Sequence, residues 1–248
     1  MISVNNIPLN VTRFPDGASQ VWKLDDRQFG RVVDVFWSFE SEAEVMHLAQ
    51  LATLLAEREC GTRLEIRCLP YARQDKPIAN DLTFALRSFA PMLNAMRWGS
   101  VKIHDPHSGV ALALIERSVA HYYNAEAAAA YVACSCDMLC FPDAGARQKY
   151  SPMFGEMPKT FASKVRDQAT GEITGTDIDG DVSGKRVLIV DDLCDGGATF
   201  IKLAAVLRER GAAFVALFVS HGLFSKGPQV LFDGGIDRIF VPEREITS

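Results

Sequence analysis

The chain has 248 residues, of which 48% are hydrophobic and 23% are charged, and its formal net charge is -5. This length holds one large domain or two small ones, each with its own core. The acidic balance provides no general basic field, so we expect no nucleic acid partner. No run is long and apolar enough to cross a bilayer and no signal-peptide pattern is present, which predicts a cytoplasmic protein without a membrane partner.

The first part of the chain predicts strands joined by turns and one amphipathic helix. A strand is expected over residues 31–39. Ser41 and Glu44 have the spacing of a capping box, which predicts a helix that begins there and runs to about Cys60. His47 lies off the apolar stripe of this helix, so we expect its side chain to be solvated.

Two strands of the first half end in polar loops. The strand expected over 64–69 runs into the polar segment 70–77, at the kind of strand end where α/β folds bind ligands, although a solvated charged turn fits equally well. A helix is expected over 81–97. The strand over 101–104 ends in a segment with an aspartate and a histidine; these side chains could bind a metal, but hydrogen-bonded structural histidines are commoner.

The second half begins with an alanine-rich helix over 124–133 and a strand over 138–141. Between residues 150 and 181 the periodic pattern weakens, and glycines and prolines become frequent. This composition indicates a mobile flap over an active site. Lys164 and Arg166 would present two cations on one side of an extended segment of that flap.

Three of the six cysteines, Cys134, Cys136 and Cys140, lie close together in the sequence. A zinc site would need a fourth ligand and the CxxC spacing, and neither is present. We therefore expect these cysteines to be small, buried and reduced thiols.

The most informative stretch is a short apolar strand over 187–190, followed by an acidic glycine loop and a helix. Gly196 and Gly197 have no Cβ, so their backbone N–H groups can close around an anion at the positive end of that helix. Asp191 and Asp192 would repel a phosphate and instead suit sugar hydroxyls or a divalent cation. Together these features predict a ribose phosphate site; an acidic turn of an ordinary α/β protein is the alternative.

The repeated strand, loop, helix order indicates a mostly parallel α/β architecture with two halves of similar design. The halves meet near residue 123, which predicts one domain over 1–123 and a second over 124–248.

Seven segments occur in the order found in the ribose-phosphate diphosphokinases, also called PRPP synthetases, and the resemblance covers nearly the whole chain. The segments are Arg13 to Gly17, Tyr71 to Asp75, Asp105 to His107, Pro142 to Gly145, Lys164 to Arg166, Val190 to Thr199 and Ser220 to Ser225. An ordinary phosphoribosyltransferase would share only the acidic glycine loop. The resemblance implies two similar phosphoribosyltransferase-like domains, each a mostly parallel sheet flanked by helices, with ATP bound on the N-terminal side and ribose phosphate on the C-terminal side.

The resemblance also implies the reaction. The family transfers the β,γ-diphosphoryl group of ATP to the anomeric hydroxyl of ribose 5-phosphate, gives PRPP and AMP, uses Mg²⁺, and works as a homo-oligomer with shared ATP sites. Lys164 and Arg166 match its mobile catalytic pair, and His107 and Asp143 match its metal contacts. The positions that match ATP contacts are Phe14, Asp16, Arg73, Gln74 and Asp75. Those that match acceptor contacts are Asp191, Asp192, Asp195, Gly196, Gly197, Ala198 and Thr199.

The chain departs from the family pattern in ways that bear on its acceptor. Gly196 stands where the family usually carries a hydroxyl, and loss of a hydrogen bond to a charged phosphate costs roughly 1.5–3 kcal/mol. The segment after Lys76 is also shorter than in the family, and Ala18 replaces a glutamate. We therefore hypothesise an acceptor whose 5-phosphate is itself substituted, such as ADP-ribose. Drift within an ordinary synthetase is the alternative.

Two rival functions remain open from the sequence. A catalytically silent regulatory homologue would be expected to lose the cationic pair or the metal contacts, yet Lys164, Arg166, His107 and Asp143 are all present. A phosphoribosyltransferase that consumes PRPP would need a hood that recognises a base, and the sequence offers no candidate for one.

Overall fold

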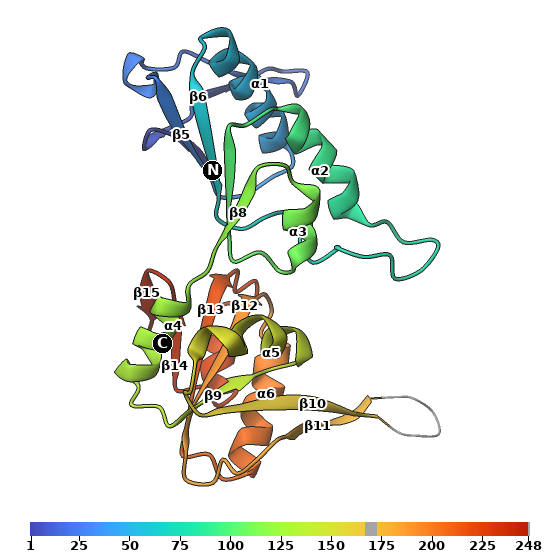
Figure 1. The fold of residues 1–248 in the computed structure, drawn as a ribbon, viewed down its shortest axis with the longest axis vertical. Helices are drawn as coiled ribbons and strands as arrows, with labels where there is room; N and C mark the ends of the chain where they lie inside the picture. Colours follow the sequence, from blue (N-terminus) through green and yellow to red (C-terminus); the bar gives the residue numbers. More distant parts are fainter. Residues whose placement is uncertain (167–172, 248) are drawn as a thin grey trace. The chain divides into compact units, whose positions relative to one another are not determined.

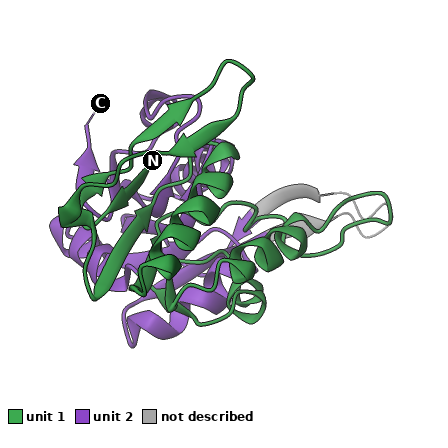
Figure 2. Cartoon of the chain, turned by 90° about the horizontal axis from the view of Figure 1, so that it is seen from above, with its two compact units in different colours: residues 1–122 green, residues 123–248 purple. Residues whose placement is uncertain are grey.

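The computed structural model describes residues 1–166 and 173–247; the side chains of residues 164–176 also lie outside what it describes. The chain divides into two compact units, residues 1–122 and residues 123–248 (Figure 2). Each unit is built on its own sheet, and most strands of both sheets run parallel. The predicted α/β class is therefore confirmed.

Unit 1 contains a six-stranded sheet in which four strands from β5 to β8 pair in parallel and β1 pairs antiparallel with β5. The strand order is β2 (Ile7–Pro8), β1 (Ile2–Val4), β5 (Val32–Trp37), β6 (Gly61–Ile66), β7 (Ser100–His104) and β8 (Ser118–His121). A separate hairpin is formed by β3 (Val11–Arg13) and β4 (Ser19–Val21). The helices of this unit are η1 (Asp26–Gln28), α1 (Ala43–Glu57), α2 (Ala85–Ala95) and α3 (Gly109–Leu114).

The core of unit 1 forms where one face of β5 meets one stripe of α1. Trp37 of β5 is fully buried. On α1, Leu48, Leu51 and Leu55 recur at the spacing of one helix face and are all fully buried in the same cluster. The apolar stripe read from the sequence is therefore the face that α1 packs inward.

The predicted capping box of α1 is wrong. The helix begins at Ala43, and no side chain caps its N-terminus. Glu44 points to other partners: its Oε2 accepts hydrogen bonds from Trp37 Nε1 at 3.0 Å and from the backbone N–H of Glu40 at 2.8 Å. A buried indole N–H needs an acceptor, and this need outweighs the local cap.

The prediction that His47 is solvated is also wrong. Its side chain is buried, and its Nε2 lies 2.7 Å from the hydroxyl of Ser19 on β4. Gln50, one turn further along α1, accepts a hydrogen bond from the backbone N–H of Val21 at 2.8 Å. These polar contacts fasten the β3–β4 hairpin to α1, which the helix periodicity alone could not reveal.

Unit 2 contains a seven-stranded sheet whose central strands are parallel and whose outermost pairs, β10 with β11 and β14 with β15, are antiparallel. The strand order is β11 (Ile173–Ile178), β10 (Lys159–Arg166), β9 (Met138–Phe141), β12 (Arg186–Cys194), β13 (Phe214–Gly222), β14 (Arg238–Val241) and β15 (Arg244–Ile246). Its helices are α4 (Asn124–Ala133), α5 (Ala144–Tyr150), η2 (Ser151–Phe154), α6 (Ala198–Glu209) and α7 (Gln229–Asp233). Strands β10 and β11 extend from the rest of this unit as a long hairpin (Figure 1). Among the helices described in both units, none is long and apolar enough to span a bilayer.

Both faces of β12 are buried, as its continuous apolar run predicts. Val187 and Ile189 belong to the cluster that also holds buried residues of α6, whereas Leu188 and Val190 belong to the cluster that holds buried residues of α4. A parallel strand covered on both faces cannot alternate apolar and polar residues, which explains the unbroken run.

The clustered cysteines are free thiols, as expected. Cys134, Cys136 and Cys140 are all buried and unbridged. Burial raises the pKa of Cys136 and of Cys140 to about 12, so both thiols stay protonated at neutral pH.

The packing of α1 predicts a large difference between two of its apolar positions. Leu48→Ala should lower the free energy of unfolding by about 2–5 kcal/mol because it leaves a cavity in the core, whereas Met46→Ala should change it by less than about 0.5 kcal/mol. Leu48 is fully buried and Met46 is 59% exposed on the same helix. Denaturant unfolding followed by tryptophan fluorescence measures this, since Trp22, Trp37 and Trp98 all lie in unit 1. Equal effects of the two substitutions would contradict this packing.

Candidate functional site

Strand β12 carries its two aspartates on the sheet rather than in the loop that the sequence predicts. The strand continues past Val190 because Leu193 and Cys194 pair with His221 and Gly222 of β13. Asp191 and Asp192 therefore stand on a strand that pairs with β13 up to its end and with β9 as far as Ile189. Their backbone positions are fixed by the sheet, which favours a preorganised site.

The glycine loop after β12 leads into the N-terminus of α6. Gly197 is the N-cap of this helix and has a left-handed φ of 79°. A Cβ at Gly197 would also lie 2.7 Å from a side-chain carbon of Leu231, so only glycine fits. As a glycine, this N-cap residue contributes no side-chain cap of its own. The first N–H groups of α6 and the helix dipole therefore form a binding position for an anion such as a phosphate.

The carboxyl edge of the unit 2 sheet gathers acidic groups beside this loop. Because β9 pairs with β12, Asp143 at the end of β9 faces the same edge as Asp191 and Asp192. Removal from water, together with the neighbouring carboxylates of Asp192 and Asp143, raises the pKa of Asp191 well above the ordinary range for aspartate. Lys149 of α5 offsets part of this repulsion, with its Nζ 3.7 Å from Asp192 Oδ2.

The donor chemistry of this edge suits Mg²⁺, which takes hard oxygen ligands. Asp143 is exposed and accepts a hydrogen bond from the backbone N–H of Ala146 at 2.9 Å, so it also caps α5. Within residues 1–166 and 173–247, no three His, Cys, Asp or Glu side chains form a metal site on their own. A Mg²⁺ ion at this edge would therefore keep water or substrate oxygens among its ligands, as this ion commonly does.

In unit 1 the loops after β6 and β7 are joined by a side-chain hydrogen bond. The hydroxyl of Ser108 donates to Asp75 Oδ2 at 2.5 Å. Arg73 and Gln74 are exposed beside Asp75, and His107 is exposed beside Ser108. The structure thus brings the loop of the predicted ATP contacts to the loop of the predicted metal contact, at the carboxyl ends of neighbouring parallel strands.

The β3–β4 hairpin presents the other two predicted ATP contacts at its turn. Phe14 is 43% exposed. Asp16 Oδ1 accepts a hydrogen bond from the backbone N–H of Ala18 at 2.9 Å, and Gly17 closes the turn with a φ of 89°. The hairpin therefore offers an aromatic ring to solvent on a well-defined turn.

The predicted cationic pair lies on β10. The backbones of Lys164 and Arg166 pair with Thr176 and Ile173 of β11, and the register shifts between Val165 and Arg166. The side chains of this pair lie outside what the structure describes, as does the segment 167–172 of the expected flap.

Two lysines near the acidic edge were missed from the sequence. Lys149 comes from α5, where nothing in the spacing marks it. Lys226 follows β13, and its Cε lies 3.5 Å from the point that a Cβ on Gly196 would occupy. Because β13 pairs with β12, the loops after both strands share one edge, and this parallel order could have located Lys226.

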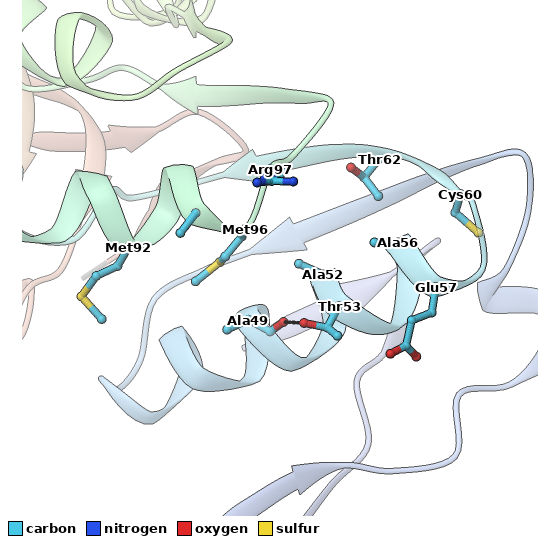
Figure 3. A pocket seen from close by; sticks show the side chains of 11 residues that line it. Ala49, Ala52, Thr53, Ala56, Glu57, Cys60, Thr62, Met92, Met96 and Arg97 are labelled. Atoms are coloured by element: carbon cyan, nitrogen blue, oxygen red, sulfur yellow. Dashed lines mark hydrogen bonds between the residues drawn. The ribbon is translucent and has the colours of Figure 1, made fainter.

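A separate groove lies between α1 and α2 and encloses about 470 Å³ (Figure 3). Its floor is made by alanines of α1, and its side is lined by Met92 of α2 and by Met96, which follows the end of that helix. The lining residues are Ala49, Ala52, Thr53, Ala56, Glu57, Cys60, Thr62, Met92, Ala95, Met96 and Arg97. None of the predicted site residues lines this groove.

Comparison with solved structures defines the class of fold. Phosphoribosylpyrophosphate synthetase from Mycobacterium smegmatis superposes with a TM-score of 0.78 at 23% sequence identity; the match covers 94% of this chain and 79% of that one. The protein therefore has the phosphoribosyltransferase-type architecture that the motifs implied.

Sequence comparison identifies a matching family model and proteins that are similar to this chain. Residues 143–244 match the model of the phosphoribosyl synthetase-associated domain. The chain is 27% identical over 227 residues to a ribose-phosphate pyrophosphokinase of Pyrococcus abyssi, which covers 90% of this chain and 79% of the relative. A ribose-phosphate pyrophosphokinase of Thermoplasma volcanium is 28% identical over 252 residues, with 93% and 81% covered. The resemblance to the ribose-phosphate diphosphokinases is confirmed.

The raised pKa of Asp191 predicts a pH-dependent stability difference. The pKa of this carboxyl is higher in the folded protein than in the unfolded chain, where it is near 4. The free energy of unfolding therefore falls as the pH rises from the unfolded pKa towards the folded pKa, because ionisation is then easier in the unfolded chain. Asp191→Asn keeps the acceptor for the Asp192 N–H but cannot ionise, so its melting temperature should exceed that of the wild type at neutral pH and equal it near pH 4.

Thermal unfolding between pH 4 and pH 8 measures this difference. Asp195→Asn is the matched control because Asp195 is an exposed carboxylate on the adjoining loop, and it should give no comparable gain. A wild type as stable as Asp191→Asn at neutral pH would contradict the electrostatic analysis of this edge.

Proposed function

We propose that the protein transfers the β,γ-diphosphoryl group of ATP to the anomeric hydroxyl of an acceptor that contains ribose 5-phosphate, in a Mg²⁺-dependent reaction that releases AMP. The observation that carries this proposal is the glycine N-cap of α6 beside Asp191 and Asp192 at one sheet edge. A phosphate position next to hydrogen-bond acceptors suits a phosphorylated sugar. Similarity to enzymes named ribose-phosphate pyrophosphokinases supports the same activity.

On the acceptor side, residues 124–248 would hold the ribose phosphate. The loop from Asp195 to Thr199, with Gly196, Gly197 and Ala198 between them, would bind the 5-phosphate through backbone N–H groups. Asp191 and Asp192 would accept hydrogen bonds from ribose hydroxyls. These contacts would fix the phosphate and the ribose ring, and so would fix the position of the anomeric hydroxyl. Fixing the reacting group before the reaction lowers the entropic part of the activation barrier.

Mg²⁺, when bound, would neutralise negative charge on the phosphate oxygens of ATP. We propose His107 of unit 1 and Asp143 of unit 2 as residues that contact Mg²⁺, each from within its own unit, and the carboxylates around Asp143 are suited to a hard cation. Without a metal, the raised pKa of Asp191 favours its protonated form. A nearby cation would lower that pKa, so metal binding should release a proton.

On the ATP side, residues 1–123 would bind the nucleotide. Arg73 and Gln74 are exposed and would contact the base and phosphates of ATP, and Asp75 would orient their loop through Ser108. Phe14 and Asp16 would meet the adenine bound to a neighbouring copy of the chain. The exposed ring of Phe14 is suited to stack on a base, and this role requires a homo-oligomer.

The chemical step needs little covalent participation by the protein. The anomeric oxygen forms a bond to the β-phosphorus of ATP as the bond from that phosphorus to the α-phosphate oxygen breaks. AMP leaves with the electron pair, and the proton of the anomeric hydroxyl is released to water. Negative charge accumulates on the transferred oxygens. We propose that Lys164 and Arg166 stabilise that charge, since positioned cations are the main catalytic resource in phosphoryl transfer.

We further propose that the acceptor is a ribose 5-phosphate whose phosphate is substituted, such as ADP-ribose. Gly196 supplies no hydroxyl to a terminal phosphate, and the side chain that lies beside its position is the flexible stem of Lys226. An acceptor with an esterified phosphate has fewer terminal oxygens to satisfy, so it would lose less by the missing hydrogen bond.

Acceptor identity is tested by incubating the protein with ATP and Mg²⁺ and either ribose 5-phosphate or ADP-ribose, with mass spectrometry of AMP and the new diphosphate ester. We expect kcat/KM to be higher for ADP-ribose. Equal or better turnover of ribose 5-phosphate would contradict the substituted acceptor and leave the diphosphotransferase activity intact. No AMP from either acceptor would contradict the activity itself.

The role of the cationic pair gives a second test. Lys164→Ala should reduce kcat by about 100-fold or more, because a charge aimed at the transition state is lost, while binding of the acceptor alone remains. Lys159→Ala is the matched control: Lys159 lies on the same strand, and its ammonium is bonded to the carbonyl of Gly155. AMP release under saturating substrates gives kcat, and calorimetry gives acceptor binding. A Lys164→Ala protein that turns over like Lys159→Ala would exclude Lys164 as a catalytic residue.

A further inference from the structure

The two glycines of the phosphate loop have different reasons to be glycine. Gly197 is required by its left-handed φ of 79° and by the close approach of Leu231. Gly196 has no such requirement, since its φ is not in the left-handed region. What a side chain at Gly196 would meet is the stem of Lys226, with its Cε, Cδ and Cγ at 3.5, 3.6 and 3.8 Å from the added Cβ.

Lys226 is held in this place by the backbone around it. The N–H groups of Leu223 and Phe224 both donate to the carbonyl of Cys194, the last residue of β12, at 2.9 and 3.2 Å. The N–H of Gly227 donates to the carbonyl of Phe224 at 2.7 Å and closes the turn that contains Lys226. The loop after β13 is therefore anchored to the strand end from which the phosphate loop begins.

In the part of the chain that the structure describes, the ammonium of Lys226 has no fixed partner. Among the described residues, no hydrogen bond or ion pair involves it, and its side chain is exposed. Nearby, the acidic groups of the edge are concentrated around Asp191 and Asp192, where Lys149 is the contacting cation. A lysine laid along a loop that binds an anion, and not already neutralised, is suited to a phosphate.

We propose that Lys226 binds the phosphate of the acceptor and takes the place of the hydroxyl that is missing at Gly196. The stem of Lys226 lies against the loop at Gly196, where a Cβ would make ordinary van der Waals contact with it and a larger side chain would project towards it. This inference rests on the proposed function, since it takes the loop from Asp195 to Thr199 as the site of the acceptor phosphate. It adds a specificity-determining residue that lies outside that loop and outside the motifs that identified it.

The relation between Gly196 and Lys226 makes a specific prediction for a double-mutant cycle. Lys226→Ala should weaken acceptor binding about tenfold or more, because a hydrogen bond to a charged group is lost. Gly196→Thr introduces a hydroxyl and also fills the space beside the lysine stem, so in that background Lys226→Ala should cost less than about threefold. Lys226→Arg should retain most of the binding, since its side chain keeps the charge.

The experiment is equilibrium binding, by calorimetry with Mg²⁺ and without ATP, of inorganic phosphate, ribose 5-phosphate and ADP-ribose. The proteins are the wild type, Lys226→Ala, Lys226→Arg, Gly196→Thr and the Gly196→Thr/Lys226→Ala pair, each checked for folding by its melting temperature. Lys185→Ala is the control because Lys185 is exposed beside the amino end of β12, and it should bind within about twofold of the wild type.

The outcomes separate this inference from the proposed activity. Binding that depends on Lys226 in a protein that makes no AMP would support the inference and contradict the activity. If the wild type makes AMP and Lys226→Ala binds the acceptor as tightly as the wild type, the activity is supported and the inference is contradicted. The inference is also overturned if Lys226→Ala costs the same factor with and without Gly196→Thr, or if the wild type binds none of the three phosphate compounds.

Discussion

The central position of β12 is the constraint on which the proposed acceptor site depends. The strand is hydrogen-bonded to β9 on one side and to β13 on the other. Because all three run parallel, the loops after them leave the sheet at one edge. The residues that follow these strands, Asp143, Asp195 and Lys226, are far apart in sequence and are gathered by the strand order alone. The site is thus a consequence of pairing, and its side chains need little further support to meet.

This edge is electrostatically unfavourable in the isolated protein. The carboxylates of Asp191, Asp192 and Asp143 repel one another, and burial adds to the cost of ionising Asp191. The core beneath β12 must hold these groups in place, and its two buried clusters, one on each face, provide the necessary packing. Such concentrated like charge is characteristic of sites that bind a cation or hydroxyl groups, where ligand binding offsets the repulsion.

Local patterns predicted the elements that depend on local interactions. The helix over 124–133 and the strand over 138–141 match α4 and β9 because alanine content and a short apolar run decide them. The end of β12 was missed, since the pairing of Cys194 with Gly222 is set by a strand distant in sequence. The burial of His47 was missed for the same reason. Its partner Ser19 belongs to the β3–β4 hairpin, and the apolar spacing along a helix gives no information about such a partner.

The candidate site likewise has features that local sequence reveals and features that depend on distant residues. Residues inside one contiguous loop, such as Gly196 and Gly197, could be found from the sequence because the chemistry of glycine before a helix is local. The sequence could not show that these two glycines have different surroundings. Gly197 lies against Leu231, whereas Gly196 lies against Lys226, and both neighbours are distant in sequence. A substitution that removes a hydroxyl from a phosphate loop reads in the sequence as a simple loss. In the folded chain the stem of Lys226, from the next loop, lies beside Gly196, so the contact we propose would add a cation where a neutral donor is missing. Such an exchange would need no change in the strands, because the loops after β12 and β13 already leave the sheet at one edge.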